Sequence, residues 1–190
     1  GSPFGGQQEQ GFITGLYVAP NGTDQSAAEE QLTRLLHFSD LVRVGLAGNL
    51  AAYEFTGASG ETISGADVDY NGNPAGYTAD PQENIVYVSK HDNETLFDAI
   101  QYKAPADVDM AGRVRMQNLG NSIVMFSQGV PFFQAADDLL RSKSLDRNSY
   151  NSGDWFNAID WTGQTTNWGR GLPPAADNEA MWPVMAGLLA

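Results

Sequence analysis

The sequence contains no cysteine, which excludes disulfide bonds and any cysteine-ligated metal centre. No apolar run approaches the roughly 18 to 20 residues that a membrane-spanning helix needs. Basic residues are also few, since 10 Lys and Arg stand against 23 Asp and Glu, and the formal net charge is −13. This acidic excess repels nucleic acid and anionic lipid surfaces, so we expect no nucleic-acid partner and no membrane insertion.

Several signatures of catalytic and metal sites are also missing. The chain has no Gly-rich phosphate loop before a helix, no Gly-x-Ser-x-Gly elbow and no His-Glu-x-x-His motif. Its two histidines, His37 and His91, are too few for a His-rich metal site. Residues 67–72 match the opening of an EF-hand calcium loop, but Thr78 stands where the bidentate Glu belongs. An ordinary Asp/Asn/Gly turn is the simpler interpretation.

The chain is long enough for a sizeable core, and its 42% hydrophobic residues indicate a packed globule. Ser26 and Glu29 fit a capping box at the start of a helix that should end near Gly45 or Gly48. Further elements are expected as short strands over 12–18, 85–89 and 130–133, helices over 94–102 and 111–126, and one or two helical turns over 137–143. Residues 49–80 read as a long excursion with one short strand, and the order of elements suits a parallel α/β arrangement.

The most informative segment is the one in which the apolar run 85–88 ends in His91-Asp92-Asn93 and is followed at once by helix-forming sequence. In α/β barrels the chemistry lies at the carboxyl ends of the strands. A second polar segment, Arg147 to Phe156, interleaves hydrogen-bonding groups with aromatic rings, which suits sugar binding. The alternatives are a histidine satisfied within the core and an aromatic cluster that only ties down a long loop.

At this point the sequence resembles a known family. Residues 87–96 resemble the fourth conserved region of glycoside hydrolase family 13, the α-amylase superfamily, and specifically its starch-debranching pullulanases and limit dextrinases. Residues 69–83, 43–50 and 1–6 resemble the same subfamily, and residues 139–157 are highly specific to debranching enzymes. The resemblance covers nearly the whole chain.

This resemblance implies an α/β fold that comprises about strands 6–8 of a (β/α)8 TIM barrel and is incomplete as an isolated chain. Residues 1–165 would be the C-terminal portion of the catalytic barrel, and residues 166–190 its end, leading to a truncated C-terminal region. Both ends of the chain look cut. The implied activity is hydrolysis of α-1,6-glucosidic branch links in pullulan, amylopectin or limit dextrins, with retention of configuration.

The resemblance also implies roles for five residues. Asp92 would hydrogen-bond sugar hydroxyls at the cleavage subsite and stabilise the oxocarbenium-like transition state, and His91 would donate to the same sugar. Asn93 would lie beside the glucan, and Arg147 and Asn148 would line the next sugar site on the non-reducing side. Related enzymes usually carry Asp after that Arg. Asn148 is therefore a departure that replaces a charged acceptor with a neutral amide.

The nucleophilic Asp and the general-acid Glu that the family requires have no counterpart motif in this sequence. We therefore expect the segment alone to be inactive, with α-glucan and the rest of the parent catalytic domain as its partners. The chemistry requires no cofactor, and no residue pattern here identifies the structural calcium that a parent enzyme could carry. A secreted or cell-surface bacterial protein is favoured over a plastid or cytoplasmic one.

Two other functions remain open from the sequence. One is another enzyme of the superfamily, such as an α-1,4-acting amylase or a branching enzyme, against which residues 141–157 argue. The other is a non-catalytic glucan-binding module or degenerate paralogue that has lost its acid pair.

Overall fold

The computed structural model describes residues 9–24, 26–90 and 92–170 of the chain. Its helices are α1 (Ala28–Leu46), α2 (Leu96–Lys103), α3 (Met110–Phe126) and α4 (Asp154–Asn157), and its strands are β1 (Glu54–Thr56), β2 (Thr62–Ser64), β3 (Asp69–Tyr70), β4 (Asn73–Pro74), β5 (Ile85–Val86) and β6 (Val130–Pro131). Short 3-10 helices lie at Phe12–Thr14, Gly65–Asp67, Pro81–Glu83, Asp137–Leu139 and Ser149–Asn151. The fold is therefore mixed α/β, as predicted.

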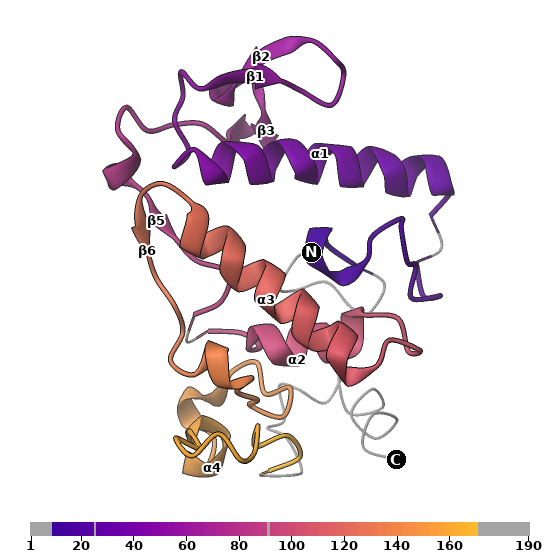
Figure 1. Cartoon of the computed structure of the whole chain (residues 1–190), viewed down its shortest axis with the longest axis vertical. Helices are drawn as coiled ribbons and strands as arrows, with labels where there is room; N and C mark the ends of the chain where they lie inside the picture. Colours follow the sequence, from indigo (N-terminus) through magenta and orange to yellow (C-terminus); the bar gives the residue numbers. More distant parts are fainter. Residues whose placement is uncertain (1–8, 25, 91, 171–190) are drawn as a thin grey trace.

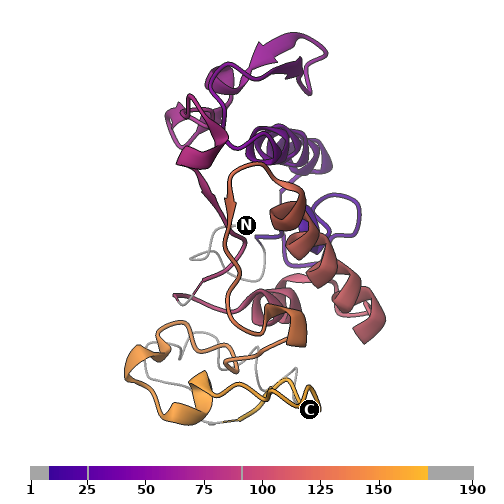
Figure 2. The same ribbon diagram turned by 60° about the vertical axis from the view of Figure 1, so that its left-hand side comes forward.

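The described part of the chain is elongated, with different elements at its two ends (Figure 1). Helix α1 and the β1–β2 hairpin lie at one end, and α4 with its surrounding loops lies at the other. Helices α2 and α3 occupy the middle and contact each other, and α3 also contacts α1 (Figure 2). No helix among the described residues is both long enough and apolar enough to cross a membrane.

Helix α1 ends where the sequence predicted but does not begin as predicted. Its N-cap is Ala27, which makes no side-chain capping bond. The hydroxyl of Ser26 instead donates to Asp24 Oδ1, at 2.5 Å, so the predicted capping box at Ser26 is wrong. The helix ends two residues before Gly48, whose φ of +74° suits the left-handed turn that stops it.

Helices α2 and α3 were both predicted, and both have side-chain caps. Thr95 Oγ1 accepts the backbone N–H of Asp98 at the start of α2, and Asp109 Oδ1 accepts that of Gly112 at the start of α3. Helix α2 ends shortly before Pro105, which cannot continue a helix.

The strands β5 and β6 pair in parallel, with Ile85 opposite Val130 and Val86 opposite Pro131. This confirms the two predicted strands and their parallel direction, although each is shorter than expected. Ile85 is 59% exposed and Val130 is 47% exposed, so this two-stranded sheet is not covered on all sides by the described residues. The predicted helical turns over 137–143 reduce to the 3-10 helix Asp137–Leu139.

The structure corrects the sequence-based assignment of two other regions. Residues 12–18 were predicted as a strand, but Phe12–Thr14 forms a 3-10 helix, and Thr14 Oγ1 accepts the N–H of Gly11. Residues 49–80 contain two antiparallel pairs, β1 with β2 and β3 with β4, rather than one short strand.

Buried apolar side chains within the described ranges form small separate clusters. Val44 of α1 packs against Val68 and Ala75 of the excursion, and Leu96 and Ile100 form a second cluster on α2. Because Tyr102 of α2 packs against Leu145, α2 also supports the loop that follows residue 141.

Candidate functional site

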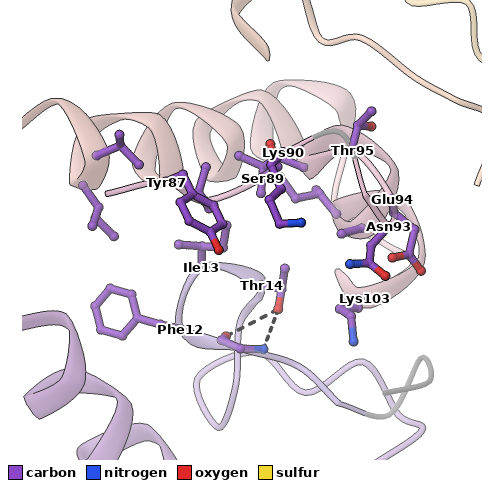
Figure 3. Close-up of a pocket in the computed structure, with 18 of the residues that line it drawn as sticks. Phe12, Ile13, Thr14, Tyr87, Ser89, Lys90, Asn93, Glu94, Thr95 and Lys103 are labelled. Atoms are coloured by element: carbon purple, nitrogen blue, oxygen red, sulfur yellow. Dashed lines mark hydrogen bonds between the residues drawn. The ribbon is translucent and has the colours of Figure 1, made fainter. Parts of the chain in front are cut away.

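A pocket of about 540 Å³ lies beside the segment that follows β5. Its walls come from this segment, from α2 and α3, and from the 3-10 helix near the start of the chain. Asn93, Glu94 and Lys103 lie together at one side of the pocket, while Phe12 and Tyr87 lie toward the other (Figure 3). The pocket therefore joins an apolar half to a polar half at the carboxyl end of β5.

The segment after β5 is fixed by contacts with distant parts of the chain. Ser89 Oγ donates to Asp137 Oδ2 at 2.8 Å, and the backbone N–H of Asn93 donates to the carbonyl oxygen of Arg147 at 3.1 Å. Asn93 has a φ of +61°, a left-handed conformation that Asn tolerates better than most residues. His91, one of the predicted site residues, lies outside the described residues.

Asp92 is exposed, with 62% of its side chain accessible. Its Oδ2 pairs with Lys90 Nζ at 3.0 Å. A pair this exposed adds at most about 1 kcal/mol to stability. Asp92 is thus a solvent-accessible carboxylate at the edge of the pocket.

Arg147 and Asn148 lie against the Asn93 side of the site. Arg147 Nε pairs with Glu94 Oε1 at 3.1 Å, and only 3% of the Glu94 side chain is exposed. The hydroxyl of Tyr102 donates to the same Glu94 oxygen at 3.0 Å. The side chain of Asn148 is exposed, and its backbone N–H donates to Asp146 Oδ1. The structure therefore brings residues 92–93 and 147–148 together, as expected for two parts of one surface.

The loop that carries Arg147 is held by Asp98, a fully buried residue of α2 that the sequence interpretation missed. Its carboxylate accepts hydrogen bonds from Ser142 Oγ at 2.5 Å, from the backbone N–H of Lys143 at 2.8 Å and from that of Leu145 at 3.2 Å. Burial raises the pKa of Asp98 to about 6, although these three donors oppose the shift.

Other buried ionisable groups near the pocket are also shifted. Burial raises the pKa of the Tyr102 hydroxyl, and the neighbouring Glu94 carboxylate raises it further, so this hydroxyl remains a donor. Burial lowers the pKa of the Lys103 ammonium, whose Nζ donates to the carbonyl oxygen of Glu9. The sequence signals for these residues were weak: Glu94 and Tyr102 are the first and last residues of the predicted helix 94–102, and Glu94 also lies in the family-like stretch 87–96.

The aromatic residues of the second polar segment do not line this pocket. Tyr150 is 86% exposed and Trp155 is 54% exposed, whereas Phe156 is buried. They lie in and around α4, at the end of the molecule farthest from α1 (Figure 1). Exposed aromatic rings can pack against the C–H faces of sugars. That these rings form a sugar-binding surface remains a prediction.

The chemistry available here is binding and charge stabilisation by the Asp92 carboxylate and the Asn93 amide, which line the pocket, together with the Arg147 guanidinium, which pairs with Glu94 beside them. These are the groups that recognise neutral polyhydroxy ligands through pairs of hydrogen bonds. Across the described ranges, no three His, Asp or Glu side chains are grouped so that they could hold a metal ion. At Asp69 the carboxylate instead accepts the N–H of Gly72 within the β3–β4 turn.

Comparison with known proteins relates the chain to enzymes. No protein-family model matches the chain. The chain is 46% identical over 186 residues to "Pullulanase 1, chloroplastic" of Arabidopsis thaliana, a match that covers 97% of the chain and 19% of that relative. It is 44% identical over 189 residues to the pullulanase of Klebsiella pneumoniae, which covers 97% of the chain and 17% of that relative.

The similarity extends to solved structures. The crystal structure of Klebsiella pneumoniae pullulanase complexed with maltotriose matches 99% of the chain and 18% of its own length, with a TM-score of 0.91 and 43% sequence identity. The ligand-free structure of that pullulanase matches with the same TM-score. The chain thus spans about one fifth of the length of the relatives it matches. The resemblance inferred from residues 87–96 and 139–157 is confirmed, and the chain is a homologue of one part of the pullulanases.

Proposed function

We propose that this chain is part of the catalytic domain of an enzyme that hydrolyses α-1,6-glucosidic branch links in α-glucans such as pullulan. The observation that carries the proposal is the Asn93–Arg147 hydrogen bond, because it joins two segments that resemble the debranching enzymes at one end of a strand. Structures of related pullulanases in complex with maltotriose support an α-glucan as the ligand.

In the proposed mechanism Asp92 stabilises the transition state. Its exposed carboxylate would accept hydrogen bonds from sugar hydroxyls at the cleavage subsite. These bonds strengthen as positive charge develops on the sugar ring, so they favour the transition state over the ground state. His91 would donate to the same sugar, and Asn93, Arg147 and Asn148 would bind the adjoining glucan.

The two groups that break and form the glycosidic bond are proposed to come from other parts of the parent domain. A retaining glycosidase uses a nucleophile and a general acid with carboxyl groups roughly 5 to 5.5 Å apart. The sequence has neither of the family's two motifs, and the relatives are about five times longer than the chain. Retention of configuration and a reaction without a cofactor belong to the same proposal.

The proposal assigns the parallel strands β5 and β6 to the later part of a (β/α)8 barrel, within residues 1–165. Two helices lie between these strands in the chain, and both strands expose apolar side chains. This supports a sheet that continues in the parent domain, because a parallel strand is normally covered on both faces. Residues 166–190 would lead out of the barrel, and most of them lie outside the described residues.

Pullulan cleavage by two purified proteins tests this function. We expect the complete gene product to release reducing sugar from pullulan and the 190-residue segment alone to release none. Cleavage by the isolated segment would refute the proposed division of the site. If the complete product bound maltotriose without cleaving pullulan, the chain would instead belong to a glucan-binding module.

A further inference from the structure

Glu94 joins the two segments that we assign to glucan binding, yet it is almost entirely shielded from solvent. Its side chain is 3% exposed, and it directly follows Asn93 in the chain. One of its oxygens, Oε1, meets both the Tyr102 hydroxyl at 3.0 Å and Arg147 Nε at 3.1 Å. A single carboxylate oxygen thus links α2 to the loop that follows residue 141.

A buried carboxylate in this place needs both partners. Leaving it with one partner removed is strongly unfavourable, because an uncompensated charge then stays out of water. The Tyr102 hydroxyl is suited to the task because burial and the Glu94 charge both raise its pKa, so it keeps its proton. This arrangement holds the Arg147 side chain in one place.

The backbone reinforces the same connection. The Asn93 N–H donates to the Arg147 carbonyl oxygen, so residues 93 and 147 are joined through the main chain while residues 94 and 147 are joined through side chains. Together these two links limit both the rotation of Arg147 relative to residues 93–94 and its distance from them. Glu94 therefore helps to set the position of the Arg147 side chain relative to Asp92 and Asn93.

We propose that Glu94 is a positioning residue, which holds Arg147 against residues 92–93 so that one glucan chain contacts both segments. This rests on the proposed function of the site. Glu94 touches no sugar in this scheme and acts through Arg147. Its loss should therefore weaken substrate binding more than turnover, and only while the Arg147 side chain is present.

A double-mutant cycle in the complete enzyme tests the proposal, with kcat and KM measured on pullulan for wild type, Glu94→Ala, Arg147→Ala and the double variant. We expect Glu94→Ala to raise KM by roughly tenfold, in line with the loss of a charged hydrogen bond, and to change kcat by less than about threefold. In the Arg147→Ala background the same substitution should raise KM by less than about twofold. Glu94→Gln keeps the acceptor oxygen and should recover part of the lost affinity.

Two further readouts separate the outcomes. Tyr102→Phe removes the other partner of Glu94 but not its pair with Arg147, so its effect on KM should be smaller than that of Glu94→Ala. Hydrogen exchange of the Asn93 amide should become faster in Glu94→Ala. Equal effects of Glu94→Ala with and without Arg147, or an unchanged KM, would overturn the proposal. A complete wild type that does not cleave pullulan would refute the proposed function itself, whatever the exchange of Asn93 shows.

Discussion

The backbone N–H of Asn93 donates a hydrogen bond to the carbonyl oxygen of Arg147, across an N···O distance of 3.1 Å. These residues belong to segments that are far apart in the chain and that the sequence identified separately. The bond joins the loop that carries Arg147 to the segment after β5, which lines the pocket.

Asp92→Asn should reduce turnover of pullulan in the complete enzyme by roughly 100-fold or more, as expected when a charge-stabilising group is lost. The fold should be unaffected, because the Asp92 side chain is 62% exposed and its pair with Lys90 is a surface one. Steady-state kinetics and circular dichroism measure the two effects. Asp80→Asn, at another exposed aspartate, is the matched control, and near-normal kcat in Asp92→Asn would contradict the assigned role.

The pH dependence of the loop at residues 142–145 should follow Asp98. Its folded pKa is about 6 against an ordinary value of 3.8, so the stability it contributes is fully present below about pH 3.8 and is lost as the pH rises through about 6. The shift corresponds to about 3 kcal/mol, at 1.36 kcal/mol per pH unit.

Hydrogen exchange of the Lys143 and Leu145 amides, corrected for the intrinsic rate at each pH, measures this effect. We expect both amides to be better protected in wild type than in Asp98→Asn at pH 4. This difference in protection should become smaller as the pH rises to 7. Asp107→Asn, at an exposed position, should leave the protection unchanged. An advantage that grows with pH would show that the shift has the opposite sign.

Arg113→Lys should destabilise the C-terminal end of α2. The Arg113 guanidinium donates to the carbonyl oxygens of Ile100, Gln101 and Pro105, and its Nε donates to that of Val108. A lysine ammonium lacks the planar fork that reaches these acceptors, so we expect a loss of about 2 to 3 kcal/mol. Thermal unfolding of the complete enzyme measures this loss. Arg115→Lys is the control, because Arg115 is an exposed residue of α3, the helix that carries Arg113, and its substitution should leave stability unchanged.

Gly76→Ala should destabilise the excursion at residues 49–80. A Cβ on Gly76 would lie 2.7 Å from the carbonyl oxygen of Leu50, a backbone atom that cannot easily move aside. We expect a cost of about 1 to 3 kcal/mol. Gly45→Ala, within α1 and with open space around its Cβ, should instead stabilise by about 0.5 to 1 kcal/mol. Equal melting temperatures for the two variants would contradict this account.

Elements with strong local signals could be predicted from the sequence. The long helices α1 and α3 and the parallel strands β5 and β6 follow from apolar spacing and turn residues. The strand predicted over residues 12–18 is wrong because the Thr14 hydroxyl bonds to the Gly11 backbone and Gly15 adopts a φ of +97°. Both features turn the backbone of this apolar segment away from an extended conformation. The capping box at Ser26 failed because Asp24 binds its hydroxyl.

The candidate site could be predicted in its surface residues but not in its support. The polar pattern singled out the segments that hold Asp92, Asn93, Arg147 and Asn148. The roles of these residues came from the family resemblance and stay predictions. The contacts of Glu94 with Arg147 and of Asp98 with residues 142–145 join positions about 45 to 55 residues apart. The spacing of apolar residues predicts local elements and cannot reveal such long-range pairs. Their burial becomes visible only when α2 is packed against the loop.

The parallel pairing of Ile85 with Val130 has a consequence for the order of folding. The stretch between these two residues contains all of α2 and α3, so the strands cannot meet until a long loop has closed. The helices have local contacts and form quickly, and their packing shortens the distance that the strands must search. We therefore expect β5 and β6 to pair late, after the two helices have docked, which leaves their edges exposed longest while the chain is being made.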